Sequence, residues 1–410
     1  EKIHDEITTR GLLGENIILD TALVDMYAKR RMLVNAQQLH DNFAIRTVVS
    51  WNALISGHVQ QGQEHDALNI FKLMEIEGIS PDAVTYVCIL KACGSTGDAA
   101  KGKEIHYELV NKGLLEENLM LSSALVDMYA KCGMLAKAQQ CHDNLSFRSV
   151  VSWNSLISGY AQQGQGHEAL QCFEQMQNEN ISPNSFTFTY LLKACVRIRS
   201  IDMGVKVHDD IVCSGLLQKN VVLGNALVDM YIKCGLREKA HCVFDNLQTR
   251  DVVTWTSLIS GYADHGKPEQ AINLFEHMIH ENVMPNAITF LSILKACSVI
   301  GDPKQCDYIH SKIEKHGLFE KDHVLGTMLV DAYAKCGSFS KARDVFEEIP
   351  KRDIVSWNAL IAGYAQMSQA NRVFYLFHKM RKDGIVPDVV TFLIRLSVCS
   401  HAGLVEEAAD

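Results

Sequence analysis

The chain lacks several features that mark particular classes of protein. No run of apolar residues approaches the roughly 20 residues that a membrane-spanning helix needs. No CxxC pair, glycine-rich phosphate loop or cluster of metal-binding side chains occurs along its 410 residues. Positive charge is not in excess either, because the formal net charge is -9, whereas nucleic-acid-binding domains are usually basic. We therefore expect no membrane span, no metal and no cofactor, and any nucleic-acid function must depend on where particular residues lie.

Tryptophan is also scarce, and its four copies are evenly placed. Trp51, Trp153, Trp255 and Trp357 are each 102 residues from the next. The same interval separates the members of three other sets, which are His4, His106, His208 and His310; Cys93, Cys195, Cys297 and Cys399; and Pro81, Pro183, Pro285 and Pro387. A fixed period is the sequence mark of a repeat array, so we predict a solenoid.

Each 102-residue unit divides into related pieces of 35, 36 and 31 residues, which contain VVSWNALISG, ILKACGSTGD and ALVDMYAKCG in the first full unit. The whole chain is read as a single array with pieces at 1–16, 17–47, 48–82, 83–118, 119–149, 150–184, 185–220, 221–251, 252–286, 287–322, 323–353, 354–388 and 389–410. Residues 1–16 are the tail, and 389–410 the head, of a 36-residue piece. The sequence is therefore expected to be a fragment of a longer chain.

Each piece is predicted to form two helices. Trp51, Leu54, Ile55 and His58 follow the i, i+3, i+4, i+7 spacing of one helix face, and a second such stripe begins at Ala67. Glycine recurs within the first helix, where the lack of a Cβ lets another helix approach. A single helical pair cannot bury its apolar face alone, so the pairs must stack. The predicted fold class is all-α, a right-handed superhelical solenoid of helix-turn-helix repeats with one continuous concave surface.

The thirteen cysteines largely follow the repeat period, with Cys132, Cys234 and Cys336 at a second shared place. We interpret them as small, reduced side chains that pack between helices. The alternatives are a reactive thiol or an intermolecular bridge.

Helical pairs of these three lengths in strict rotation resemble the pentatricopeptide repeat family of plants. More narrowly, the motifs VVSWNALISG, ILKACGSTGD and ALVDMYAKCG are similar to the P, L and S motifs of its PLS class. A tetratricopeptide array fits less well, because its W-x2-L-G-x2-Y signature is absent. The resemblance implies sequence-specific binding of single-stranded RNA in a mitochondrion or chloroplast. It also implies a role as specificity module in C-to-U editing or RNA processing, with editing cofactors or a deaminase, in cis or in trans, as partners.

Two positions of each motif, counted from its first residue, are candidates for base recognition. Position 2 is always apolar and could sandwich a base; in the P and S motifs of the full units it is Val49, Met120, Val151, Val222, Val253, Val324 and Val355. Position 5 and the final residue are polar and vary, as base reading requires; the pairs are Asn52 with Asp82, Ser123 with Ser149, Asn154 with Asn184, Asn225 with Asp251, Thr256 with Asn286, Thr327 with Asp353, and Asn358 with Asp388. The alternative is that position 5 is a solvated helix N-terminus, where such residues are common.

The L motifs carry Val87, Thr189, Leu291 and Leu393 at position 5, so we expect them to act mostly as spacers. Their lysines at position 9 are candidates for phosphate contacts, and so are the lysines at position 13 of the S motifs. These candidates are Lys91, Lys193 and Lys295 in the L motifs, and Lys131, Lys233 and Lys335, with Lys29, in the S motifs. An aspartate precedes each S-motif lysine by four residues, so an ordinary helix-stabilising ion pair is equally compatible.

The array itself is expected not to be an enzyme. A zinc deaminase needs H-x-E followed by P-C-x-x-C. His106 and Glu108 match the first half, but the equivalent copy has His208 and Asp210, and PCxxC occurs nowhere. A deaminase domain could follow only beyond Asp410.

Carried over from the resemblance, the residue pairs predict the site U-n-A-(C/U)-n-U-A-n-G-U from the motif at 48–82 onward, with L motifs unread. The terminal Asp or Asn is expected to choose pyrimidine against purine, while position 5 adjusts to ring size. A protein-binding scaffold that uses the same surface is the competing hypothesis, and the acidic net charge favours it.

Overall fold

The computed structural model describes residues 2–14, 16–43, 45–115, 118–319, 322–367 and 369–402. Regular structure in these residues is helical throughout. The chain divides into two compact units, Glu1–Ile211 and Val212–Asp410, and both consist of the same helical pairs. The all-α solenoid of helix-turn-helix repeats that the sequence predicts is therefore the observed fold.

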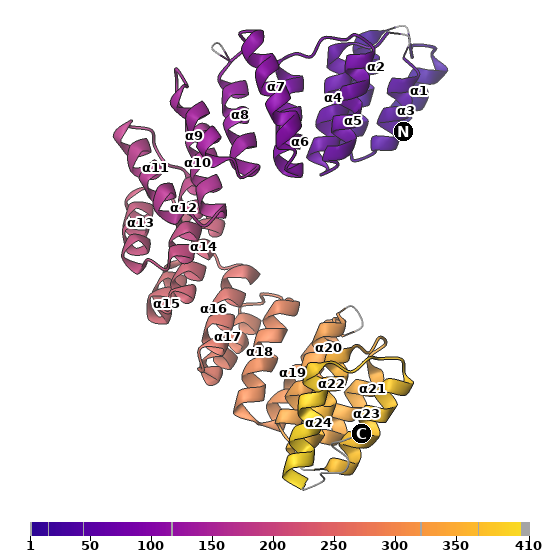
Figure 1. Cartoon of the computed structure of the whole chain (residues 1–410), viewed down its shortest axis with the longest axis vertical. Helices are drawn as coiled ribbons and strands as arrows, with labels where there is room; N and C mark the ends of the chain where they lie inside the picture. The colour runs from indigo at the N-terminus through magenta and orange to yellow at the C-terminus, as the bar shows by residue number, and fades with distance from the viewer. Residues whose placement is uncertain are drawn as a thin grey trace. The chain divides into compact units, whose positions relative to one another are not determined.

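The first unit holds six first helices of motifs, each followed by its second helix (Figure 1). Its elements are α1 (Lys2–Thr9), α2 (Ile17–Lys29), α3 (Leu33–Asp41), α4 (Val48–Gln60), α5 (Glu64–Ile76), α6 (Ala83–Thr96), α7 (Ala99–Asn111), α8 (Leu119–Lys131), α9 (Leu135–Asp143), α10 (Val150–Gln162), α11 (Gly166–Asn178), α12 (Ser185–Ile198) and α13 (Ile201–Cys213), which ends just past the unit boundary.

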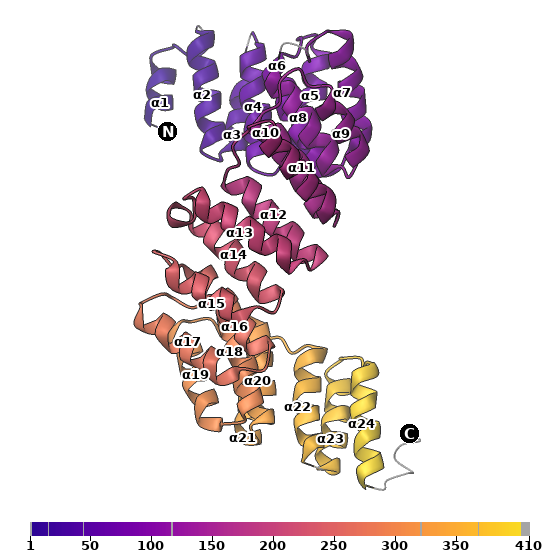
Figure 2. The same ribbon diagram turned by 90° about the vertical axis from the view of Figure 1, so that its left-hand side faces the viewer.

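The second unit continues the same alternation (Figure 2). Its elements are the short 3-10 helix η1 (Leu217–Lys219), α14 (Val221–Lys233), α15 (Arg237–Asn246), α16 (Val252–Asp264), α17 (Pro268–His280), α18 (Ala287–Ile300), α19 (Pro303–Lys315), α20 (His323–Lys335), α21 (Phe339–Glu348), α22 (Ile354–Gln366), α23 (Ala370–Lys382) and α24 (Val389–Ala402). Every first helix, from α2 to α24, begins at the residue where the sequence starts a new piece.

Local sequence explains where the helices start and stop. A polar residue caps each first helix of the P motifs; Thr47, for example, accepts a hydrogen bond from the backbone N–H of Ser50. In the motifs from α2 to α21, the turn to the second helix passes through a residue with positive φ, most often a glycine such as Gly62 at 73°, a conformation that glycine adopts without steric cost. Each motif therefore specifies its own helical hairpin.

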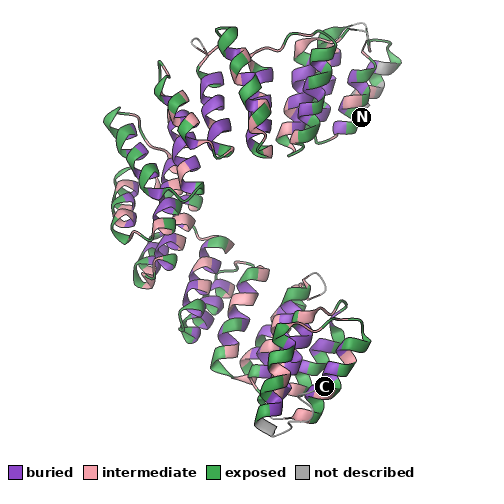
Figure 3. Cartoon of the chain, in the orientation of Figure 1, coloured by how far each residue is buried: buried purple, intermediate pink, exposed green. Residues whose placement is uncertain are grey.

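Within each unit, the first helix of one motif packs against the first helix of the next. In the first unit α4 contacts α2 and α6, and in the second α20 contacts α18 and α22. The residues at these helix–helix contacts are buried, whereas the outer faces of the second helices are exposed to solvent (Figure 3). The predicted apolar stripe is confirmed, because Trp51, Leu54 and Ile55 are all buried.

The recurring glycine of the P motifs lies where two first helices come closest. A Cβ at Gly159 would lie 2.8 Å from the Cβ of Ala130 in the preceding motif. Such a distance is not tolerated, so any larger side chain would push α10 away from α8. The close approach expected from the sequence is confirmed.

All thirteen cysteines are free thiols. Cys93, Cys195, Cys297 and Cys399 are buried among the helices, as a packing role predicts. Cys132 lies near the same layer, with its Sγ 3.6 Å from the carbonyl oxygen of Cys93. Most of these side chains therefore act as small apolar groups, although Cys213 and Cys242 are exposed.

Candidate functional site

The apolar residues at position 2 lie on the surface, in the first turn of each first helix. Their exposed fractions run from 44% at Val324 to 81% at Ile18. The set comprises Ile18, Val49, Val84, Met120, Val151, Phe186, Val222, Val253, Ile288, Val324, Val355 and Val390. One exposed valine is ordinary, but an apolar side chain exposed at the same place in every motif is not needed for the fold. Each unit therefore presents a row of regularly spaced apolar contacts.

The polar residue at position 5 lies one helical turn further on and is largely covered. Asn52, Ser123, Thr256, Thr327 and Asn358 are buried, with at most 8% of their surface exposed. They sit in the second turn of the helix, and the helix cap is a different residue. The alternative hypothesis of a solvated helix N-terminus does not fit this placement.

The final residue of each motif caps the first helix of the next motif. Asp82 caps α6, and its carboxylate accepts a hydrogen bond of 2.9 Å from the backbone N–H of Thr85. Asn184, Asp251, Asn286, Asp353 and Asp388 cap the following helices in the same way. Sequence reasoning missed this role, although the signal was present as a polar residue followed three residues later by Thr or Ser.

Stacking brings position 5 and the final residue together in all four motifs that have Asn at position 5. The asparagine Nδ2 donates to the terminal side chain, over 2.9 Å from Asn52 to Asp82 and 3.1 Å from Asn154 to Asn184. The same bond is 3.1 Å from Asn225 to Asp251 and 3.0 Å from Asn358 to Asp388. These partners are 26 or 30 residues apart in sequence.

The other three predicted pairs are not joined directly in the part of the chain that the structure describes. Thr256 shares a 2.7 Å hydrogen bond with Thr289, the residue that Asn286 caps. Thr327 donates to the backbone oxygen of His323 at 3.2 Å. For Ser123 no bond to Ser149 is found. The Ser149 hydroxyl instead caps α10, where it accepts a hydrogen bond from the backbone N–H of Ser152.

The hydrogen bonds of each cap determine which atoms remain for a ligand. In Asp82, Oδ1 accepts from Thr85 and Asn52, whereas no donor to Oδ2 is found among the described residues. Burial alone would raise the pKa of Asp82, but hydrogen bonds from Thr85 and Asn52 outweigh it and hold the pKa below its usual value. An ionised oxygen is therefore left to accept a hydrogen bond.

With asparagine at the end of the motif, the available atom has the opposite character. The backbone N–H of Thr187 donates to Oδ1 of Asn184 at 3.1 Å, which orients the amide. Its Nδ2 group is then the half that remains for a ligand, and it can only donate. Asp and Asn thus present opposite hydrogen-bonding groups from the same half-buried place.

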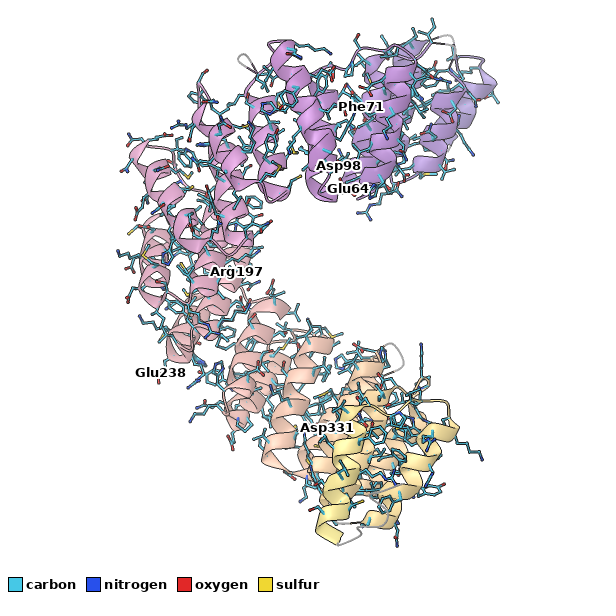
Figure 4. The ribbon with its side chains drawn as sticks, viewed as in Figure 1. Glu64, Phe71, Asp98, Arg197, Glu238 and Asp331 are labelled. Carbon is cyan, nitrogen blue, oxygen red and sulfur yellow. The ribbon has the colours of Figure 1, made fainter. Side chains whose placement is uncertain are left out.

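The lysine candidates lie at the surface with different partners. Lys131, Lys233 and Lys335 pair with the aspartate four residues earlier, at 2.7, 2.8 and 2.7 Å, and Lys29 does the same at 2.6 Å. Asp331, the partner of Lys335, is labelled on α20 in Figure 4. Exposed i, i+4 pairs contribute only about 0.3–0.5 kcal/mol, so a phosphate could still replace the aspartate.

The lysines of the L motifs differ among themselves. Lys295 pairs with Asp264 of the preceding motif at 2.6 Å, and the Nζ of Lys193 lies 5.4 Å from the centre of the Tyr190 ring. Lys91 is exposed, and no ion pair is found for it among the described residues. At position 5 of these motifs Val87 is buried, and Thr189 donates to its own helix at Ser185.

The residues that resemble half of a deaminase motif have structural partners. The Nδ1 of His106 lies 2.8 Å from the hydroxyl of Tyr129, and Glu108 accepts hydrogen bonds from Tyr86 and Lys112. Among the described residues, no group of three His, Cys, Asp or Glu side chains could hold a metal ion. In that same part of the chain, no helix has the length and apolar character needed to cross a bilayer.

Relatives of known sequence share the whole array. Pentatricopeptide repeat-containing protein At5g27110 of Arabidopsis thaliana is 35% identical over 99% of this chain, which spans 58% of that protein. The chloroplastic protein At1g11290 is 37% identical over 99% of the chain and 50% of its own length. The mitochondrial protein At2g03380 is 34% identical over 99% and 58%. The chain thus spans only half to three fifths of these relatives.

Solved structures show the same fold at lower sequence identity. The pentatricopeptide repeat protein PPR10 in complex with an 18-nt psaJ RNA element matches 95% of this chain and 59% of its own, with a TM-score of 0.74 and 17% identity. PPR10 from maize has a TM-score of 0.68 over 97% and 64% of the two chains, also at 17% identity.

Family profiles match each copy of the 102-residue unit. The profile of the PPR repeat family covers residues 46–95, 148–197, 250–298 and 352–401. A second profile, the PPR repeat, covers 84–114 and 327–354. Together these matches include more than half of the chain, which therefore belongs to the PPR repeat family.

Proposed function

We propose that the chain binds single-stranded RNA in a sequence-specific way, with one base read by each P or S motif. The observation that carries this proposal is the recurrence, in each P and S motif of the full units, of an exposed apolar side chain at position 2 with polar residues at position 5 and at the motif's end, which are hydrogen-bonded to each other in four motifs. Aromatic bases stack on apolar platforms regardless of their identity, and polar groups read their Watson–Crick edges. PPR10, which shares the fold, forms a complex with RNA.

The chemistry of the caps suggests how bases are distinguished. A terminal Asp offers an ionised acceptor, which suits the ring N–H of uracil or guanine. A terminal Asn offers a donor, which suits the unprotonated ring nitrogen of cytosine or adenine. The terminal residue would then choose between these two base classes, a choice that differs from the pyrimidine-versus-purine role expected from the resemblance. Position 5 lies deeper and would set the space left for the ring.

The preferred site is U-n-A-(C/U)-n-U-A-n-G-U, with C favoured at the fourth base by the donor of Asn184. The L motifs act as spacers, since Val87 is buried and Thr189 is bonded within its own helix. Several relatives are named as chloroplastic or mitochondrial, so we place this chain in one of these organelles. There it would direct C-to-U editing or processing, with a deaminase acting in cis or in trans and the array itself non-catalytic.

Selection from a pool of random single-stranded RNA tests the proposal. Enrichment of the predicted pattern supports base reading. Binding without any sequence preference, or no binding at all, would contradict it, and the second outcome would favour a protein partner. The acidic net charge keeps that second function in consideration.

Replacing Thr327 with Asn is expected to change the preferred base at that motif from G to U. The terminal acceptor Asp353 is unchanged, while position 5 becomes Asn, the residue found there in the motifs predicted to read U. We expect a shift of about 1–3 kcal/mol, comparable to other base-edge contacts. Competition binding with two RNAs that differ only at the ninth base measures the shift, and Thr9→Asn, far from any predicted base, serves as the control.

Reversing the charge of Lys91 and Lys193 is expected to weaken RNA binding and reduce its salt dependence. Each lost phosphate contact should lower the slope of log affinity against log salt by about 0.7. Lys295→Glu should change the slope less, because Asp264 already partly neutralises that lysine. Lys72→Glu on the second helix α5 is the matched control. An unaltered slope in the double variant would show that these lysines do not meet phosphates.

A further inference from the structure

Position 3 is Ser or Thr in the P and L motifs, whereas the S motifs have Leu there, and it is Thr wherever the preceding motif has Asn at position 5. All four L motifs have Thr here: Thr85, Thr187, Thr289 and Thr391. Three P motifs have Ser, and only Thr254 differs. The S motif before Thr254 is the only S motif with Asn at position 5, Asn225. In every case, therefore, an Asn at position 5 is followed by a motif with Thr at position 3.

The threonine hydroxyl contacts that asparagine directly. Thr254 donates to Oδ1 of Asn225 at 2.5 Å, and Thr85 donates to Oδ1 of Asn52 at 2.6 Å. The equivalent bonds of Thr187 and Thr391 are both 2.7 Å. Each asparagine amide is thus held at both ends, by the threonine at Oδ1 and by the terminal residue at Nδ2.

The serine hydroxyl at the same position points elsewhere. Ser50, Ser152 and Ser356 each donate to the backbone oxygen of the capping residue, at 2.9, 3.0 and 2.8 Å. They still complete the capping box, as the threonines do. Capping therefore does not distinguish the two residues, whereas the direction of the hydroxyl does. These serines follow motifs with Thr21, Ser123 and Thr327 at position 5, so they have no asparagine to meet, and the branched Cβ of threonine also restricts its χ1 rotation more than serine is restricted.

The hydrogen bond from the backbone N–H to the cap residue determines which atoms of the asparagine donate and accept. A backbone N–H must donate to Oδ1 of the cap, so the asparagine can meet that oxygen only with its Nδ2. Its Oδ1 then needs a donor, because a buried carbonyl oxygen without one is destabilising. Threonine supplies that donor, and a serine whose hydroxyl stayed bonded to the backbone, as that of Ser50 is, would not supply it.

We propose that Thr85, Thr187, Thr254 and Thr391 are positioning residues for base selection, each acting on the asparagine of the preceding motif. This inference rests on the proposed RNA-reading function. Threonine fixes the amide and with it the direction of the Asn Nδ2 and the cap oxygen, so the base opposite that motif meets one hydrogen-bonding pattern. With serine in place of threonine, the Asn and the terminal residue would discriminate less strictly between bases.

The test is Thr254→Ser in the full chain, with single-stranded RNAs that carry U, C, A or G at the sixth base of the predicted site. Serine is native at this position in three P motifs, so folding and capping should persist, and thermal denaturation checks this. We expect the preference for U at the sixth base to fall about 3- to 10-fold, the range for one lost hydrogen bond. Preferences at the other bases should stay unchanged.

A reciprocal variant gives an independent measurement. Thr327→Asn alone creates an Asn behind a motif that has Ser356, whereas Thr327→Asn with Ser356→Thr restores the pairing seen elsewhere. The double variant should discriminate U from G at the ninth base about 3- to 10-fold better than the single variant. Ser152→Thr, which follows Ser123 and not an asparagine, is the control and should change no preference.

The outcomes separate this inference from the proposed function. If the unchanged protein shows base preferences but Thr254→Ser leaves them intact, or weakens all RNAs equally, the positioning role is wrong while RNA reading stands. If the unchanged protein shows no preference for any base, the proposed function itself has failed.

Discussion

Lowering the pH from 7 to 5 is expected to destabilise the unit Glu1–Ile211 by up to about 4 kcal/mol, through His40 and His142. Both side chains are fully buried, with ring centres 4.5 and 4.3 Å from Trp51 and Trp153. Burial lowers the pKa of each to about 4, with a further contribution from Arg46 beside His40 and Arg148 beside His142.

The sign follows from proton binding. Unfolded histidines titrate near pH 6.5, so below that pH the unfolded chain binds protons that the folded chain cannot. Stability is therefore complete above about pH 6.5 and is lost as the pH falls toward 4. At pH 5 this linkage amounts to about 2 kcal/mol for each histidine.

The second unit supplies the matched substitution. Phe244 and Phe346 occupy the equivalent positions, with ring centres 4.6 and 4.7 Å from Trp255 and Trp357. His142→Phe should therefore preserve packing and remove about half of the acid sensitivity. Urea denaturation at pH 7 and pH 5 measures the change. An equal loss of stability in both proteins on acidification would show that other groups cause it.

Replacing Trp153 with Ala is expected to cost about 3–5 kcal/mol of folding free energy, the usual range for deleting a large buried aromatic side chain. Only 1% of its surface is exposed, and its indole Nε1 donates to Glu179 at 3.2 Å. The same glutamate pairs with Arg148, which closes the junction between two motifs. Removing the ring therefore leaves a cavity and loosens that junction.

Because each motif contacts only its neighbours, the destabilisation should centre on the motifs around 119–184. Hydrogen exchange of the full chain would locate it there, and urea denaturation would measure its size. Trp153→Phe keeps most of the volume and should cost clearly less than the alanine variant. A loss below about 1 kcal/mol for Trp153→Ala would contradict the packing seen here.

The proposed RNA binding is compatible with a net charge of -9. The S-motif lysines pair with Asp127, Asp229 and Asp331, so each pair carries little net charge. Salt dependence would then come mainly from Lys91 and Lys193. Affinity would rely more on apolar platforms and hydrogen bonds than on overall attraction.

The sequence alone determined the fold class and the register of the helices. The 102-residue period and the 3.6-residue stripe through Trp51, Leu54 and Ile55 both report on burial, which is a property of each residue type at its place in a helix. The apolar residue at position 2 was also predictable, since it breaks the burial pattern in every copy. Gly159 indicated close packing of two helices because glycine is the only residue without a Cβ.

Only the tertiary structure decided how the polar residues are connected. Asn52 and Asp82 are 30 residues apart, and they meet because α4 and α6 stack side by side. Asp82 caps a helix, fixes the Asn52 amide and offers an ionised oxygen. These three roles depend on distances between atoms that the spacing of residues in the sequence does not give. The same holds for threonine and serine at position 3, whose hydroxyls differ only in direction. Burial can be predicted from the type of each residue and its place in a helix. Hydrogen-bond geometry between helices depends on how the helices pack, so it is known only from the tertiary structure.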